Sequence, residues 1–150
     1  MGVRARRSHL AGRRIVLLSL VLGLALSACG SKPSPSLPPV PAPPEVVLDT
    51  YLRALVKGDC AAAGALAVGT FTAFNGDLCG HVTVTAYRID GNNIDGLGLR
   101  LEDVREVVFG TLITTRGGGF DLPDGEHAWF YSLARQPDGS WRLAGGGTGP

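Results

Sequence analysis

The sequence predicts an α+β domain, with two or three N-terminal helices packed against a curved antiparallel sheet of about four strands. Apolar residues first recur at helical spacing, and an alanine-rich run follows almost without a break. From residue 81 onward, β-branched and aromatic runs alternate with turn residues. Because the helical runs come first and the strand runs follow, the pattern indicates an α+β domain.

The first helix is predicted to begin around Pro44 and to end at Gly58. Four apolar residues at i, i+3, i+4 and i+7 form one stripe of this helix: Leu48, Tyr51, Leu52 and Leu55. Asp59 can cap a second, alanine-rich helix over residues 60–68, which Gly69 ends. Residues 70–76 add at most one further turn.

Four strands are predicted, each from its own run of residues: 81–89, 104–115, 127–135 and 141–145. In the first run, Val82, Val84 and Ala86 are expected on one face. Pro137-Asp138-Gly139 predicts a tight hairpin between the last two strands. The glycine-rich end, residues 145–149, is expected to be a flexible tail.

The first 28 residues are predicted to be a lipoprotein signal peptide. Five arginines and no acidic residue accompany an apolar run from Ile15 to Leu26, which is too short to span a bilayer. The run ends in Leu26-Ser27-Ala28-Cys29, which resembles a bacterial lipobox. The resemblance implies cleavage between Ala28 and Cys29 and a lipid on the Cys29 thiol. An ordinary signal peptide followed by a chance cysteine is the alternative.

A lipid on Cys29 predicts attachment to the cell membrane, facing its extracytoplasmic side. Residues 29–44 then form a linker, in which seven of the fifteen residues from Gly30 to Pro44 are proline. Such a composition favours extended polyproline II. Residues 45–150 are enough for one domain.

Removal of residues 1–28 leaves nine basic and thirteen acidic residues, a net charge of −4. Nucleic-acid binding needs a basic face, so no nucleic-acid partner is expected. Both faces of the runs at 105–114 and 127–135 are substantially apolar. One face must meet the helices, which leaves the other for an envelope protein partner or a homodimer.

The three cysteines form an odd count, which lipidation of Cys29 resolves. In an oxidising compartment, Cys60 and Cys79 are then predicted to form a disulfide, with two buried free thiols as the alternative. Two cysteines nineteen residues apart lack the close ligand pairs of zinc motifs. We therefore expect no metal site and no cofactor.

Residues 46–66, "VVLDTYLRALVKGDCAAAGAL", and residues 138–149, "DGSWRLAGGGTG", carry a resemblance to a known family. In these runs the chain resembles small bacterial lipoproteins with a nuclear transport factor 2-like domain, also called the cone fold. The resemblance implies helices packed inside a curled sheet. The same fold serves isomerases, dehydratases, cyclases and binding domains without activity, so it does not choose a function.

Aromatic residues could line a pocket inside such a domain with rings and hydroxyls, and five are candidates: Tyr51, Tyr87, Phe109, Trp129 and Tyr131. Pockets of this kind bind small apolar ligands that a few polar groups orient. Packing in the core explains the same residues equally well.

No catalytic residue is predicted. His81, Asp90 and His127 are outside candidates for a base, and the alternative is that they are exposed or satisfied residues at strand ends. Acidic residues near turns, Asp77 among them, are expected to be solvated and to keep a pKa near 4, which makes a poor base.

The leading hypothesis is a lipid-anchored envelope protein whose non-catalytic cone-fold domain binds a small ligand or another envelope protein. An isomerase- or cyclase-like enzyme acting in the cone cavity is one alternative. A structural dimer or accessory subunit is another.

Overall fold

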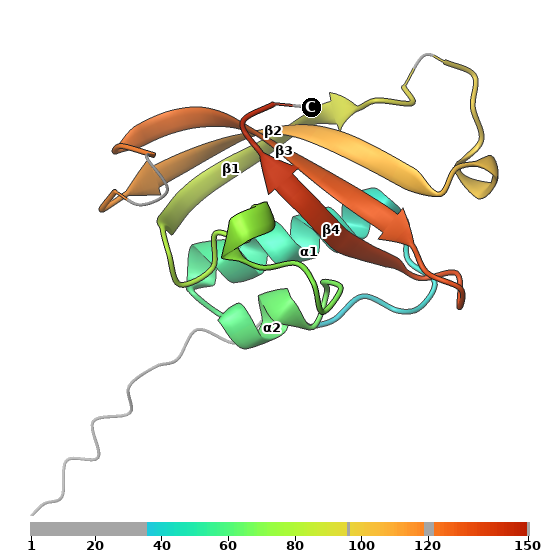
Figure 1. Cartoon of the computed structure of the whole chain (residues 1–150), viewed down its shortest axis with the longest axis horizontal. Helices are drawn as coiled ribbons and strands as arrows, with labels where there is room; N and C mark the ends of the chain where they lie inside the picture. The colour runs from blue at the N-terminus through green and yellow to red at the C-terminus, as the bar shows by residue number, and fades with distance from the viewer. Residues whose placement is uncertain (1–35, 96, 119–121, 150) are drawn as a thin grey trace, which may run out of the picture. The chain divides into compact units, whose positions relative to one another are not determined.

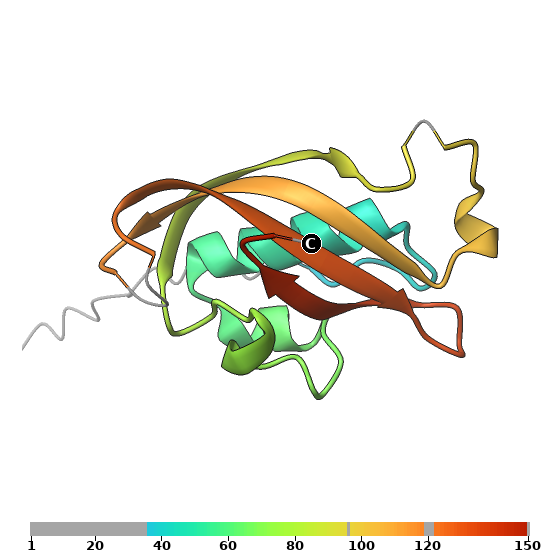
Figure 2. The ribbon, with the colours of Figure 1, turned by 45° about the horizontal axis from the view of Figure 1, so that its top comes forward.

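The computed structural model describes residues 36–95, 97–118 and 122–149. Its main elements are α1 (Pro44–Lys57), α2 (Cys60–Gly64), β1 (Thr83–Asn92), β2 (Glu106–Arg116), β3 (Gly125–Arg135) and β4 (Trp141–Gly147). Two single turns of 3-10 helix, η1 (Ala73–Asn75) and η2 (Leu101–Asp103), lie in the loops. The strands form one antiparallel sheet in chain order. The predicted α+β class and four-stranded antiparallel sheet are confirmed, and the sheet curls over α1 (Figures 1 and 2).

Helix α1 buries the predicted stripe and begins and ends close to the predicted residues. Pro44 stands in its first turn, where a missing N–H costs nothing. Gly58 ends it with a left-handed φ of 70°, and the Gly58 N–H donates to the Leu55 carbonyl. Leu48, Tyr51 and Leu52 are at most 1% exposed, because this stripe faces the sheet.

A β-bulge in β1 changes the predicted face pattern. Val84 pairs with Thr115 and Ala86 pairs with Thr114, so Thr85 is an extra residue. Beyond a bulge the alternation is reversed. The expectation that Ala86 shares the face of Val84 was therefore wrong: Ala86 is exposed, and Tyr87 is half-buried against the core.

The second helix is shorter than the sequence predicts. It ends at Gly64 instead of continuing to Val68. The backbone of the next residues pairs with β4: the Val68 N–H donates to the Leu143 carbonyl, and the Leu143 N–H donates to the Leu66 carbonyl. This pairing covers part of the open edge of the sheet and satisfies its backbone groups. Helix propensity depends only on the local sequence and does not include this stabilisation.

The expectation of a flexible glycine tail was also wrong for its first three residues. Gly145 to Gly147 continue β4 and pair with Phe130 to Ser132 of β3. A Cβ on Gly146 would lie 3.0 Å from the Trp129 Nε1 atom and 3.1 Å from the Gly76 carbonyl oxygen. The end of β4 is rich in glycine because its backbone passes directly over Trp129 and the backbone of Gly76.

The end of the predicted linker packs on the domain. Residues 36–43, here called the strap, include Ala42, which is only 8% exposed. The strap lines a hollow of about 100 Å³ together with Leu66 and Trp141. The packed domain therefore begins before residue 45.

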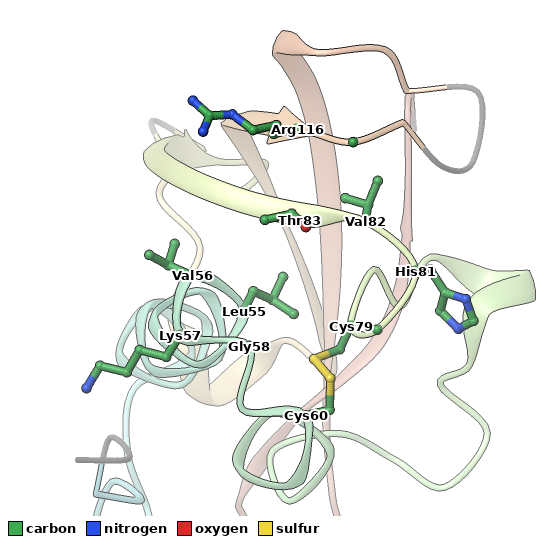
Figure 3. A pocket seen from close by; sticks show the side chains of 12 residues that line it. Leu55, Val56, Lys57, Gly58, Cys60, Cys79, His81, Val82, Thr83 and Arg116 are labelled. Atoms are coloured by element: carbon green, nitrogen blue, oxygen red, sulfur yellow. A yellow bond between two sulfur atoms is a disulfide. The ribbon is translucent and has the colours of Figure 1, made fainter. Parts of the chain in front are cut away.

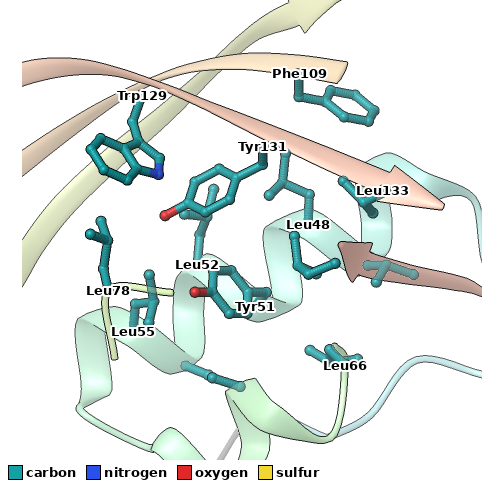
Figure 4. Close-up of a cluster of buried hydrophobic side chains, with 14 of the residues drawn as sticks. Leu48, Tyr51, Leu52, Leu55, Leu66, Leu78, Phe109, Trp129, Tyr131 and Leu133 are labelled. Carbon is teal, nitrogen blue, oxygen red and sulfur yellow. The ribbon is translucent and has the colours of Figure 1, made fainter. Parts of the chain in front are cut away.

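One core fills the space between α1 and the sheet, and Figure 4 shows its centre. Its largest fully buried side chains include Tyr51, Tyr131 and Phe109. In the described part of the chain, no helix is long and apolar enough to cross a membrane.

Candidate functional site

Three of the predicted pocket aromatics meet in the middle of the core. Tyr51 comes from α1, and Trp129 and Tyr131 come from alternate positions of β3, so all three point between helix and sheet (Figure 4). They are 1%, 5% and 0% exposed, respectively. The rings of Tyr51 and Tyr131 pack edge to face, with centroids 5.4 Å apart. Almost none of their surface is accessible to water, so these rings pack against neighbours and do not line a cavity.

Asp77 is the polar partner of this cluster. The Tyr51 hydroxyl donates to Asp77 Oδ1 at 2.9 Å, and the Cys79 N–H donates to the same oxygen at 3.0 Å. The expectation that Asp77 is a solvated turn carboxylate was wrong, because the residue is half-buried and reaches a core hydroxyl. Only its position in a turn is visible in the sequence, and nothing there indicates the long-range bond.

Two buried polar atoms beside Asp77 and Tyr51 are unsatisfied. Neither Trp129 Nε1 nor the Tyr131 hydroxyl has a hydrogen-bond partner among the described residues. The Gly146 backbone lies over Trp129 and Tyr131 and closes the space above them. Such groups cost free energy in the folded state, because water has been removed without a replacement.

The environment keeps both core tyrosines neutral. Burial raises the pKa of Tyr51, and the neighbouring Tyr131 and Asp77 raise it further. Burial also raises the pKa of Tyr131, and Asp77 acts in the same direction, while the adjacent Tyr51 hydroxyl acts in the opposite direction. Neither phenol can act as a phenolate near neutral pH, so the two tyrosines supply hydroxyl groups and not a base.

The other two pocket candidates contribute to packing at different places. The Tyr87 hydroxyl donates to Asp49 Oδ1 at 2.6 Å, and Asp49 also pairs with Arg53 on the next turn of α1. Burial, followed by this hydrogen bond, raises the pKa of Tyr87. Phe109 is 2% exposed and lies in the core. The structure thus brings the five aromatics to one side of the sheet, but not around one open pocket.

The three outside candidates for a base lie away from the buried cluster. Asp90 is exposed and accepts a hydrogen bond from Arg88 at 2.6 Å. His81 is exposed just before β1. His127 shares the inward-facing parity of Trp129, but it lies near the start of β3, and its Nε2 atom is 2.8 Å from the Pro123 carbonyl oxygen.

The structure contains the predicted disulfide. Cys60 at the start of α2 is bonded to Cys79 in the loop before β1, with their Cα atoms 5.5 Å apart. This bond forms one wall of a cleft of about 380 Å³ at the end of α1 (Figure 3). Sequence reasoning did not find the cleft, because its lining comes from three separate segments of the chain: residues 55–60 without residue 59, residues 79–83, and residues 116 and 117.

The cleft has an apolar wall and a basic rim. Leu55 and Val82 face it from α1 and from the start of β1 (Figure 3). Lys57 and Arg116 extend from one side, and His81 lies beyond the disulfide. No aspartate or glutamate is among the lining residues.

Two larger hollows occur on the surface. One, of about 520 Å³, lies beside Phe130 and Gly110 on the sheet face opposite α1. The other, of about 570 Å³, lies between the start of α1 and the β1–β2 loop.

Among the described residues, no group of three or more histidine, cysteine, aspartate or glutamate side chains is placed to hold a metal ion. Comparisons with protein-family models, with curated proteins and with solved structures find no match to this chain.

Proposed function

We propose that this protein is a lipid-anchored, extracytoplasmic binding protein with a non-catalytic cone-fold domain. The lipobox-like Leu26-Ser27-Ala28-Cys29 supports the anchor. The curled antiparallel sheet over α1 supports the cone fold. The disulfide agrees with an oxidising compartment.

The filled interior is the observation that carries a binding function over an enzymatic one. A carbon-acid enzyme needs a tuned base and an oxyanion donor around a space that admits substrate. Here Tyr51, Trp129 and Tyr131 occupy that space, and each is at most 5% exposed. The outside candidates His81 and Asp90 are exposed. Recognition on the surface is the role that this arrangement supports.

The disulfide cleft is the proposed binding site. Its apolar wall and its basic rim of Lys57 and Arg116 suit an anionic group attached to an apolar portion. A small ligand with a carboxylate or phosphate has this chemistry, and so does an acidic segment of another envelope protein. The cleft volume of about 380 Å³ is within the usual range for small-molecule sites.

Replacement of Cys29 tests the anchor. The native protein is expected in the membrane fraction with an acylated mass, and Cys29→Ala is expected to lose both the acyl mass and the membrane retention. Retention of Cys29→Ala in the membrane, together with an unacylated native protein, would exclude the anchor.

Titration with defined anions tests the cleft. We expect an aliphatic carboxylate or a short glutamate-rich peptide to shift the NMR signals of Val82 and Gly117, and Arg116→Gln to weaken binding several-fold. Arg105→Gln is the matched control, because Arg105 is an exposed arginine outside the cleft lining. Equal weakening by both substitutions would show a general charge effect and remove the cleft as a site.

Proton exchange tests the absence of catalysis. A panel of ketones in deuterated buffer is expected to exchange at the background rate. Exchange above background that Asp77→Asn or His127→Gln abolishes would favour the isomerase-like alternative.

A structural dimer is the second candidate, favoured by the sheet face opposite α1. This face carries the half-buried apolar residues Val108, Leu112 and Phe130, and no described helix covers it. Sedimentation would then give a dimer that Phe130→Glu dissociates. A monomer at high concentration would exclude this candidate.

A further inference from the structure

Three leucines project from the loop between β1 and β2. Leu97, Leu99 and Leu101 are 64%, 51% and 41% exposed. They alternate along five residues, and Figure 1 shows this loop extending beyond the end of the sheet. Leu99 and Leu101 border the hollow of about 570 Å³, whose other lining residues include Ile94, Phe109 and Pro43. The same hollow is also lined by Glu45, Asn92 and Asp95, so its surface is mixed. The clustered exposed leucines at its border still indicate a contact surface, because apolar side chains gain free energy when water is removed from them.

The base of the loop is held in place by its own polar groups. The Asn93 N–H donates to the Val108 carbonyl at 2.9 Å, and the Asn93 side-chain oxygen accepts from the Val108 N–H at 2.9 Å. The Ile94 N–H donates to the side-chain oxygen of Asn92 at 3.0 Å. The leucines are therefore presented from a fixed base, so their exposure belongs to the folded domain.

The short chain segment between Cys29 and Ser36, here called the tether, limits how far the leucines can lie from the membrane. Only seven residue steps separate Cys29 from Ser36, which span at most about 25 Å. A domain of about 100 residues has a radius of gyration of about 13 Å and is therefore wider than this tether is long. The anchor thus keeps the domain against the bilayer. The strap then runs to Pro43, which borders the same hollow as Leu99.

We propose that the leucine loop, Leu97–Leu101, inserts its side chains into the interface of the bilayer to which the chain is anchored. The inference rests on the proposed lipid anchor. Arg100, within the loop, forms an ion pair with Glu102, and nearby Arg88 pairs with Asp90. The contact is therefore apolar, and it does not require anionic lipid. It would fix the orientation of the domain and so the direction in which the disulfide cleft faces.

Tryptophan fluorescence of the lipidated protein in phosphatidylcholine vesicles tests the proposal. Leu99→Trp is expected to shift its emission to the blue and to be quenched by lipids with brominated acyl chains at least about twofold more than Phe74→Trp. Phe74 is the matched control, because it is fully exposed in η1, which contacts β4 at the opposite edge of the sheet. The native Trp129 and Trp141 are buried and contribute equally to both variants.

Two outcomes separate the inference from the proposed function. If the native protein does not float with the vesicles, the anchor itself is wrong, and the proposal is overturned with it. If the protein floats but brominated lipid quenches both variants equally, the anchor stands and the leucine loop does not insert. Equal quenching would overturn the proposal in favour of a protein partner for the loop. Quenching of Leu99→Trp that is unchanged in high salt would support an apolar contact.

Discussion

The two core tyrosines differ in whether their hydroxyl group has a hydrogen-bond partner. The Tyr51 hydroxyl donates to Asp77, whereas the Tyr131 hydroxyl has no partner among the described residues. Both rings are almost completely buried, and they pack against each other. Removal of the same oxygen atom from each residue therefore has opposite consequences.

We predict that Tyr51→Phe lowers the free energy of unfolding by about 1.5–3 kcal/mol, because it breaks a hydrogen bond to a carboxylate. Tyr131→Phe is expected to leave stability unchanged or to raise it by up to about 1 kcal/mol, because it removes an unsatisfied buried group. Urea unfolding of the two variants makes the comparison. A similar loss in both would show that the Tyr131 hydroxyl has a partner in solution.

The raised pKa values of Tyr51 and Tyr131 predict a loss of stability in alkali. An unfolded phenol has a pKa near 10, and the folded pKa values of these two are higher. The folded state therefore keeps its protons while the unfolded state loses them, so stability is fully present below about pH 10 and falls as pH rises towards the folded values. Each phenol contributes up to about 1.4 kcal/mol per pH unit in that range.

Thermal unfolding between pH 8 and pH 11 measures this effect. Tyr131→Phe is expected to flatten the decline, and Tyr87→Phe to change it less, because Tyr87 is only half-buried. A melting temperature that stays constant up to pH 11 would contradict the prediction.

At the level of elements, the close contact between η1 and β4 depends on two glycines. Gly76 follows η1 with a φ of 102°, and a Cβ built on it would overlap the backbone of Gly146. Gly146 lies in turn over Trp129. Two segments seventy residues apart thus meet backbone to backbone, and a side chain on either would separate them.

We predict that Gly146→Ala lowers the free energy of unfolding by about 1–3 kcal/mol through overpacking. Gly76→Ala is expected to cost more, because it adds strain at a positive φ to the overlap. Denaturant unfolding measures both. Gly69→Ala is the control, since a Cβ there meets nothing within 4 Å, and it is expected to be neutral or slightly stabilising. A loss in the control equal to that of Gly146→Ala would refute the packing explanation.

The sequence predicts the elements whose residues carry their own periodic pattern. The stripe from Leu48 to Leu55 and the alternation around Trp129 are local, and both elements occur near their predicted positions. The bulge at Thr85, the early end of α2 and the extension of β4 depend on partners far along the chain. No local propensity records such contacts, so these three features could not be predicted.

The candidate site was predictable only in part, for the same reason. The aromatic residues predicted for an interior pocket do lie between α1 and the sheet. Whether such rings enclose a cavity or fill it depends on packing density, which the sequence does not reveal. The bond from Tyr51 to Asp77 and the cleft beside Cys60 join residues from distant segments. Only the cysteine count indicated one of these links in advance.

For the whole molecule, the Cys60–Cys79 bond links the start of α2 to the loop that precedes β1. It closes a loop of about twenty residues, which predicts a contribution of about 3 kcal/mol through the unfolded chain. We expect the Cys60→Ala/Cys79→Ala variant to lose about 2–4 kcal/mol of unfolding free energy, measured by urea unfolding. Equal stability of the oxidised and the reduced native protein would contradict this prediction.

The strap would have a mechanical consequence if the domain carries the lipid anchor proposed above. A pull directed along the chain from Cys29 reaches residues 36–43 before it reaches α1. Leu37 and Val40 are more than half exposed, so the buried Ala42 and the contacts with Leu66 and Trp141 provide most of the resistance. Peeling the strap away would lengthen the tether by about 25 Å, at about 3.1 Å per residue, and would leave the core of the domain folded. On the lipid anchor proposed above, the strap would give the domain two distances from the bilayer, a shorter one with the strap packed and a longer one with the strap detached under load.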